Sequence, residues 1–245
     1  MTWWQALLLA GGGVIAGIIN SVAGGGSTLT VPLLVLAGVS GNSANGSNRV
    51  GILTSSVAAS ASFRKLGVSG MAHAIPVMIP VLIGSLIGSI GVSRLTDEAF
   101  ETVFGLLMIP LIVLAIRKPS VRVEGARIWG RTTTVVVFAL IGIYGGAVQA
   151  GVGLVLLAAL TRAGFDLVTA NNIKMLVTVA VTLVALPVFM FNGQVDWIPA
   201  LVLAAGFTIG GWFGASVAVK GGERLIRATM IVATLVLAGS LLGFY

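Results

Sequence analysis

The sequence predicts an all-α polytopic membrane protein of two inverted repeats, each a glycine-tipped re-entrant or broken helical hairpin plus three transmembrane helices. Three observations favour this fold class: an apolar composition, long hydrophobic runs, and a second half that repeats the first. Of the 245 residues 57% are hydrophobic and only 9% are charged, whereas a soluble domain carries about 25% charged residues. We therefore expect the chain to lie in a bilayer.

Apolar runs separated by short polar connections fill almost the whole chain, at residues 5–37, 43–63, 71–93, 99–116, 132–161, 168–191, 197–219 and 225–243. Most of these runs match the roughly 20 residues that a helix needs to cross hydrocarbon. We expect a first membrane repeat at 1–118, a basic cytoplasmic linker at 119–131 and a second membrane repeat at 132–245. The first run lacks the short, basic-flanked pattern of a cleaved signal peptide, so we place it in the mature protein.

The composition argues against a metal or redox enzyme. The chain has no cysteine and a single histidine, which disfavours disulfides, thiolate metal sites and a haem or zinc site. We expect no cofactor, no metal and no catalytic residues. The net charge of +7 does not indicate nucleic acid, because most cations flank apolar runs, as they do in oriented membrane proteins.

The second half repeats the first without gaps when the chain is shifted by 126 residues, the offset between Val22 and Val148. This shift places "VAGGGS" on "VQAGVG" and "AGVSGNSAN" on "AGFDLVTAN". Repeats of this kind are typical of secondary transporters. The same shift of 126 residues pairs Gly84 with Gly210 and Gly88 with Gly214. This four-residue spacing of glycines predicts close helix packing.

The positive charges favour an inverted relation between the halves. If every run crossed once, the halves would be parallel and seven loop cations would lie inside against five outside. If the first run of each half instead enters and leaves on the same side, eleven lie inside and only Arg94 lies outside, with both termini facing out. In that arrangement glycines 24–26 and residues 150–153 form the tips, where positive φ and close backbone approach favour glycine. The alternative is a flexible kink in a simple spanning helix.

Two cations lie inside apolar runs, where a charge is costly and indicates function. Arg49 lies early in the second run and Lys174 early in the sixth. Because all seven carboxylates lie in connections or at run ends, we expect no protein partner for these cations and infer an exchangeable anion. The alternative is that both side chains snorkel to the membrane interface. The candidate substrate-binding residues are Asn20, Ser21, Gly24, Gly25, Gly26, Ser27, Thr28, Asn45, Asn48, Arg49, Gln149, Gly151, Gly153, Asn171, Asn172 and Lys174.

These segments resemble a known family. "GIINSVAGGGSTLTVPLLVLAG", "SANGSNRVGILTSSVAASASFRKLG" and "TANNIKMLV" are similar to the TauE/SafE family of bacterial permeases, also called the sulfite exporter family. The resemblance covers nearly the whole chain and implies a transporter of sulfite or an organosulfonate such as sulfoacetate, working by alternating access in the bacterial inner membrane. The second tip departs from the first, with Val152 where the first has Gly26 and Lys174 where the first half has Asn48.

An anion channel would use the same residues, and an intramembrane hydrolase would need His73 or Lys174 as the base for a serine nucleophile. The expected partners are a small anionic substrate, which is a sulfur oxyanion or organosulfonate, and the lipid bilayer. A homodimer is a further candidate, and nucleic acid is not expected.

Overall fold

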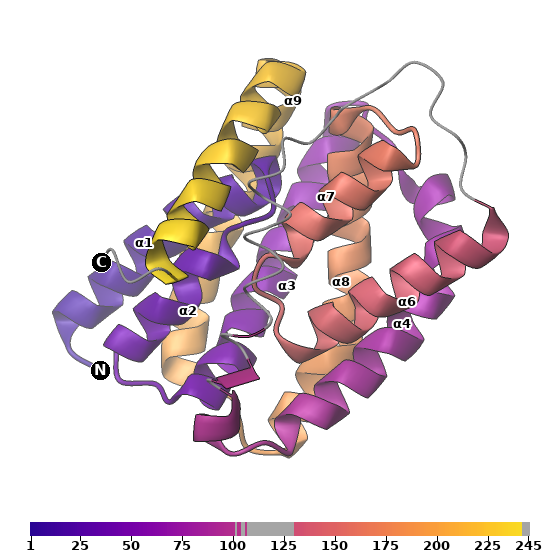
Figure 1. Ribbon diagram of the computed structural model, residues 1–245. Coiled ribbons are helices and arrows are strands. Elements are labelled where there is room, and N and C mark those ends of the chain that lie inside the picture. Colours follow the sequence, from indigo (N-terminus) through magenta and orange to yellow (C-terminus); the bar gives the residue numbers. More distant parts are fainter. Residues whose placement is uncertain (101, 104–105, 107–129, 242–245) are drawn as a thin grey trace.

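The computed structural model describes residues 1–100, 102–103, 106 and 130–241, and every regular element in that part of the chain is a helix (Figure 1). The first half contains α1 (Trp3–Val22), α2 (Ser27–Leu36), α3 (Gly41–Lys65) and α4 (Met71–Ser93), and the second contains α6 (Arg131–Ala147), α7 (Val152–Arg162), α8 (Leu167–Phe191) and α9 (Trp197–Leu241). The predicted run at 99–116 lies mostly outside the described residues, and so does the basic linker.

Within the described residues, four helical segments are long and apolar enough to cross a membrane: α1, α4, α8 and residues 197–221 of α9. Their outward faces carry large, exposed apolar side chains. Ile79 on α4 is 70% exposed and Phe191 at the end of α8 is 92% exposed, and such faces are suited to contact with lipid rather than with water. The all-helical, membrane-spanning class predicted from composition is therefore confirmed.

The first apolar run is a helical hairpin rather than a kinked single helix. α1 ends at Val22, and after the turn α2 runs back along it, so that Gln5 Nε2 donates a hydrogen bond to Ala37 O at 3.3 Å. A Cβ on Gly12 would meet the side chain of Leu33, farther along the same pair. Figure 1 shows the two helices side by side. In this segment two helices joined by a turn therefore replace one continuous helix.

The first helix of each half packs on the last described helix of the other half. α1 packs against α9, and Gly206, Gly210 and Gly214 of α9 contact the backbone of α1 at residues 10, 14 and 18, respectively. Because residue numbers increase in the same direction along both helices, the two helices are parallel. α6 packs in the same way on α4, where Gly84 and Gly88 contact its backbone (Figure 1). The close packing predicted from these four-residue spacings is confirmed.

α3 and α8 lie between these two pairs and run antiparallel. A Cβ on Gly46 near the start of α3 would meet Phe189 near the end of α8, while Gly70, just beyond α3, abuts Asn172 and Ile173 near the start of α8. Asp166 begins α8 as its N-cap and accepts hydrogen bonds from Val168 N and Thr169 N at 3.0 and 2.9 Å, which satisfies two of the free donors at a helix start.

One predicted boundary is absent. The sequence separates a run at 197–219 from another at 225–243, but helical structure continues through this connection as α9. The segment Lys220–Arg224 contains two glycines but no proline, and its Glu and Arg are good helix formers. Local sequence there weakens the helix without ending it.

Candidate functional site

The first tip lies between α1 and α2 and is buried over residues 21–27. Gly24 has φ +92°, a conformation that favours glycine, and Thr28 Oγ1 donates to Gly25 O at 2.7 Å. Within the described chain the backbone N–H groups of Gly25, Gly26 and Ser27 have no acceptor. Such groups at a helix start attract negative charge.

The second tip lies between α6 and α7. Gly151 has φ +74°, and Gln149, which is 3% exposed, has φ +63° although it carries a side chain. The Tyr144 hydroxyl donates to Ala150 O and ties the turn to the last turns of α6. Tyr144 was not a candidate in the sequence, because an aromatic residue in an apolar run gives no sign of such a bond.

The two tips touch at Gly24 and Gly153. A Cβ built on either glycine would overlap the backbone of the other. Glycine is therefore required here for close approach, and at Gly24 also for its positive φ. The contact brings the candidate residues of the two halves to one region in the interior.

Lys174 on α8 holds the end of α1. Its side chain is 1% exposed, and its ammonium donates to Asn20 O at 2.8 Å. One turn earlier, Asn171 Nδ2 donates to Ser21 O and Val22 O at 2.6 and 2.9 Å. These carbonyls belong to the last turn of α1, where they have no partner within the helix and carry the negative end of its dipole. Two of the three ammonium protons are left without a partner in the described chain.

Arg49 on α3 holds the end of α6 in the corresponding way. The guanidinium is fully buried, and its two terminal nitrogens donate to Gly145 O, Gly146 O and Ala147 O at 3.1, 2.5 and 3.1 Å. It also donates to Gln149 Oε1 at 3.3 Å and lies 4.4 Å from the centroid of the Phe189 ring. Within the part of the chain that the structure describes, Nε is its one donor nitrogen without a partner.

The capping is reciprocal between the halves. Asn45 Nδ2 donates to Ala147 O at 2.8 Å. The offset of 126 residues pairs Asn45 with Asn171 and Ala147 with Ser21, and Asn171 forms the equivalent bond to Ser21 O. Two sequence expectations are thereby corrected. The cations do have protein partners, because helix-terminal carbonyls take the place of carboxylates, and neither cation snorkels, because both are buried.

Further polar groups at the first tip have unused hydrogen-bonding capacity. Asn48 Oδ1 accepts from Thr30 Oγ1 at 2.6 Å, but neither Asn48 Nδ2 nor Asn20 Nδ2 has a partner among the described residues. Asn20 lies against Gly26, and Thr30 donates to Gly26 O at 3.4 Å. Buried donors without partners are costly. The tip therefore offers several donors to a ligand that accepts hydrogen bonds.

The structure divides the candidate residues into three groups. At or beside the first tip are Asn20, Ser21, Gly24, Gly25, Gly26, Ser27, Thr28, Asn48, Asn171 and Lys174; at the second are Asn45, Arg49, Gln149, Gly151 and Gly153; Asn172 lines a separate pocket. Ser21 is committed elsewhere, because its hydroxyl donates to Gly211 O at 3.1 Å. Thr30 and Phe189 were not predicted, since their roles depend on contacts between helices.

The chain is similar to known membrane transporters. The sequence profile of the family described as "Sulfite exporter TauE/SafE" matches residues 9–241. The chain is similar to the probable membrane transporter protein ORF9 of Sinorhizobium sp, with 26% identity over 94% of this chain and 89% of the relative. It is also similar to the probable membrane transporter protein YfcA of Escherichia coli K12, with 25% identity over 94% and 86% of the two chains. No solved structure matches the chain.

Proposed function

We propose that this chain, which belongs to the sulfite exporter TauE/SafE family of membrane transporters, carries a small sulfur oxyanion or organosulfonate across the membrane by alternating access. It is a multi-pass protein of a bacterial membrane. The name of the family supports sulfite as the first substrate to test. The printed names of the relatives specify a membrane transporter and no substrate.

The observation that carries the proposal is the set of unused donors at the first tip. Among the residues that the structure describes, two ammonium protons of Lys174, Asn20 Nδ2, Asn48 Nδ2 and the backbone N–H groups at the start of α2 have no partner. Donors and positive charge together suit an oxyanion, which accepts hydrogen bonds and carries negative charge. A half-helix N-terminus directed toward an anionic substrate group is a recurrent device in transporters.

Arg49 is assigned a different task. Most of its donors already bind carbonyls of the second tip, so we propose that it positions that tip and that Lys174 is the main anion-binding cation. The asymmetry agrees with the residue types, because the second tip has only Gln149 as a side-chain donor and that side chain accepts from Arg49.

We also propose that the halves are inverted and that the hairpins are re-entrant. Three features support this relation. α3 and α8 span 41–65 and 167–191, which are 126 residues apart at both ends. These two equivalent helices are antiparallel, as inversion requires, and the first apolar run folds back on itself. Backbone that breaks at membrane depth is tolerated where protein buries it, and both tips are buried.

The competing functions make different demands on the residues. A hydrolase needs a base hydrogen-bonded to its nucleophile, but His73 packs edge-on against Phe165, and Lys174 donates to a backbone carbonyl. Neither residue is paired with a serine in the described chain. A channel would share the first-tip donors and differ from a transporter in its kinetics.

Counterflow in proteoliposomes tests the transporter function. We expect vesicles loaded with unlabelled sulfite or sulfoacetate to accumulate the labelled anion transiently and with saturation, because a carrier exchanges one bound anion for another. Empty liposomes and liposomes loaded with a carboxylate of similar size are the controls. Rapid flux without counterflow would indicate a channel, and no flux of any sulfur oxyanion would contradict the proposal.

The inverted arrangement predicts which positions lie on the same side of the membrane. Since the chain has no cysteine, single cysteines at Thr2, Asn192 and Ser69 can be labelled selectively. We expect an impermeant thiol reagent to label Thr2→Cys and Asn192→Cys in intact cells and to leave Ser69→Cys unlabelled until the cells are opened. Parallel halves would place all three positions inside, so protection of Thr2→Cys and Asn192→Cys would exclude the inverted arrangement.

A further inference from the structure

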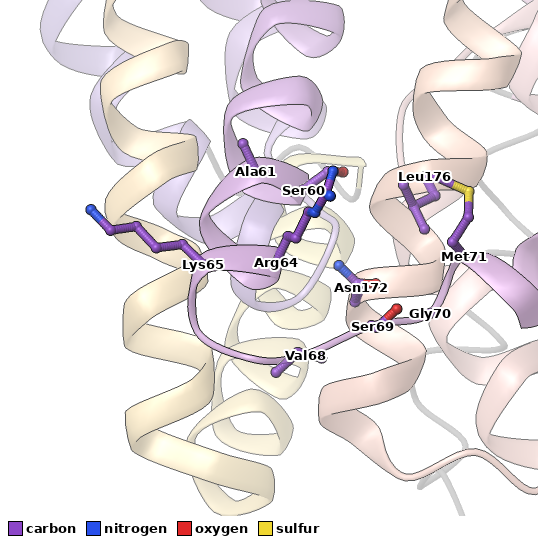
Figure 2. A pocket seen from close by; sticks show the side chains of 10 residues that line it. All are labelled: Ser60, Ala61, Arg64, Lys65, Val68, Ser69, Gly70, Met71, Asn172 and Leu176. Carbon is purple, nitrogen blue, oxygen red and sulfur yellow. The ribbon is translucent and has the colours of Figure 1, made fainter.

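A pocket of about 850 Å³ opens between the end of α3, the start of α4 and α8. Its polar groups come from Ser60, Arg64, Lys65, Ser69 and Asn172, and Met71 and Leu176 form part of its apolar wall. Figure 2 shows this pocket, with the loop at Val68–Gly70 along one edge. It lies on the side where the loops are basic, which the positive-inside rule assigns to the cytoplasm.

Two neighbouring cations at this pocket point in different directions. The Arg64 side chain runs between α3 and α8 toward Ser60, whereas Lys65 points away toward α9 (Figure 2). Lys65 Nζ lies 5.8 Å from the centroid of the Trp212 ring. Neither cation forms an ion pair in the described chain, and the residues lining the pocket include no carboxylate. The pocket is therefore open, electropositive and supplied with an uncompensated guanidinium.

Its polar wall includes hydrogen-bonding groups that the protein does not use. The Ser60 hydroxyl has no partner, and the Asn172 amide, which is 3% exposed, makes no hydrogen bond within the described chain. Ser56, which is buried one turn before Ser60, also has an unpartnered hydroxyl. Arg49 lies two turns before Ser56 on nearly the same face of α3, and its Nε has no partner in the described chain. These unused donors therefore lie along α3 from the pocket toward Arg49 at the second tip.

We infer that this pocket is a peripheral anion subsite, where Arg64, Ser60 and Asn172 collect small oxyanions on the cytoplasmic side of the transport path. The inference rests on the proposed anion transport and adds a place of first contact. A guanidinium can bind sulfonate or sulfite oxygens in a bidentate manner. An electropositive cleft with low-dielectric walls also raises the local concentration of anions. Lys65 also lines the pocket and carries the same charge, but its ammonium lies over the Trp212 ring, so we expect it to contribute less than Arg64.

The charge preference of a cysteine in the pocket tests this subsite without requiring turnover. Ser69 is exposed and lines the pocket, so Ser69→Cys in the detergent-solubilised full chain can be reacted with two thiosulfonates of similar size, one sulfonated and one trimethylammonium. We expect the sulfonated reagent to react faster, and Arg64→Gln to lower the ratio of the two rates about five-fold at low salt. The ratio cancels any change in thiol reactivity.

Lys65→Gln is the matched control, because it removes an equal charge from the adjacent residue. We expect it to change the ratio less than two-fold, and 1 M salt to abolish the preference in the parent. A ratio that survives Arg64→Gln, or that falls equally with Lys65→Gln, would overturn the subsite. The two proposals can also fail separately. If the parent showed no counterflow but Ser69→Cys still reacted faster with the sulfonated reagent in an Arg64-dependent manner, the transport function would be refuted and the anion subsite would stand.

Discussion

Replacing Lys174 by glutamine is expected to weaken the binding of sulfite or sulfoacetate by roughly 10-fold to 150-fold. The ammonium is buried, and two of its protons have no partner in the described chain and can bind a ligand. A charge-assisted hydrogen bond contributes about 1.5–3 kcal/mol when shielded from water, and about 1.4 kcal/mol corresponds to a factor of ten. Isothermal titration of the purified protein measures the change.

The substitution is chosen to remove charge while sparing the fold. Glutamine keeps an N–H donor that can serve Asn20 O, so the end of α1 retains a cap. Arg94→Gln is the matched control, because it removes an exposed cation that forms none of the hydrogen bonds described at either tip. If the Lys174→Gln protein bound both anions within a factor of two of the parent, the ammonium would not contact the substrate.

Replacing Arg49 by glutamine is expected to act mainly on stability. Gly145 O and Gly146 O at the end of α6 would lose their donor inside the protein, and Ala147 O would keep only Asn45 Nδ2; each buried polar group left unpaired costs about 1–3 kcal/mol. A total near 3 kcal/mol would lower the melting temperature by about 6–12 °C in a chain of this length. Thermal unfolding in detergent is the measurement.

Arg49→Lys separates charge from geometry. Lysine keeps the charge but loses the planar fork that reaches several carbonyls at once, so we expect a loss of stability between those of the parent and Arg49→Gln. Lys65→Gln, an exposed cation, should leave the melting temperature unchanged. Full stability of Arg49→Gln would show that the α6 carbonyls do not need the guanidinium.

The elements that the sequence predicts well are those determined by local patterns. The glycine-rich segment at 24–26 predicts an interruption, and the helix does break between Val22 and Ser27. The offset of 126 residues relates both ends of α3 to those of α8. By contrast, α9 continues through a connection whose glycines only weaken a helix. Local pattern therefore locates strong breaks and misjudges weak ones.

The partners of the two buried cations could not be predicted in the same way. Arg49 binds carbonyls about 96 to 98 positions away along the chain, and Lys174 binds one 154 positions away. Carbonyls are present at every residue, so no residue type marks those that accept. One signal was present in the sequence. A broken helix leaves unpaired carbonyls at its end, and no carboxylate lies within the apolar runs to bind the cations instead of those carbonyls.

A single series of titrations tests most directly whether the anion binds at the first tip. The parent, Lys174→Gln and Arg49→Lys are titrated with sulfite and with sulfoacetate under identical conditions, using only protein that elutes as a folded species. We predict that Lys174→Gln loses at least about ten-fold in affinity, whereas Arg49→Lys stays within two-fold of the parent. The reverse order, with affinity lost in Arg49→Lys and kept in Lys174→Gln, would contradict the account and place the anion at the second tip.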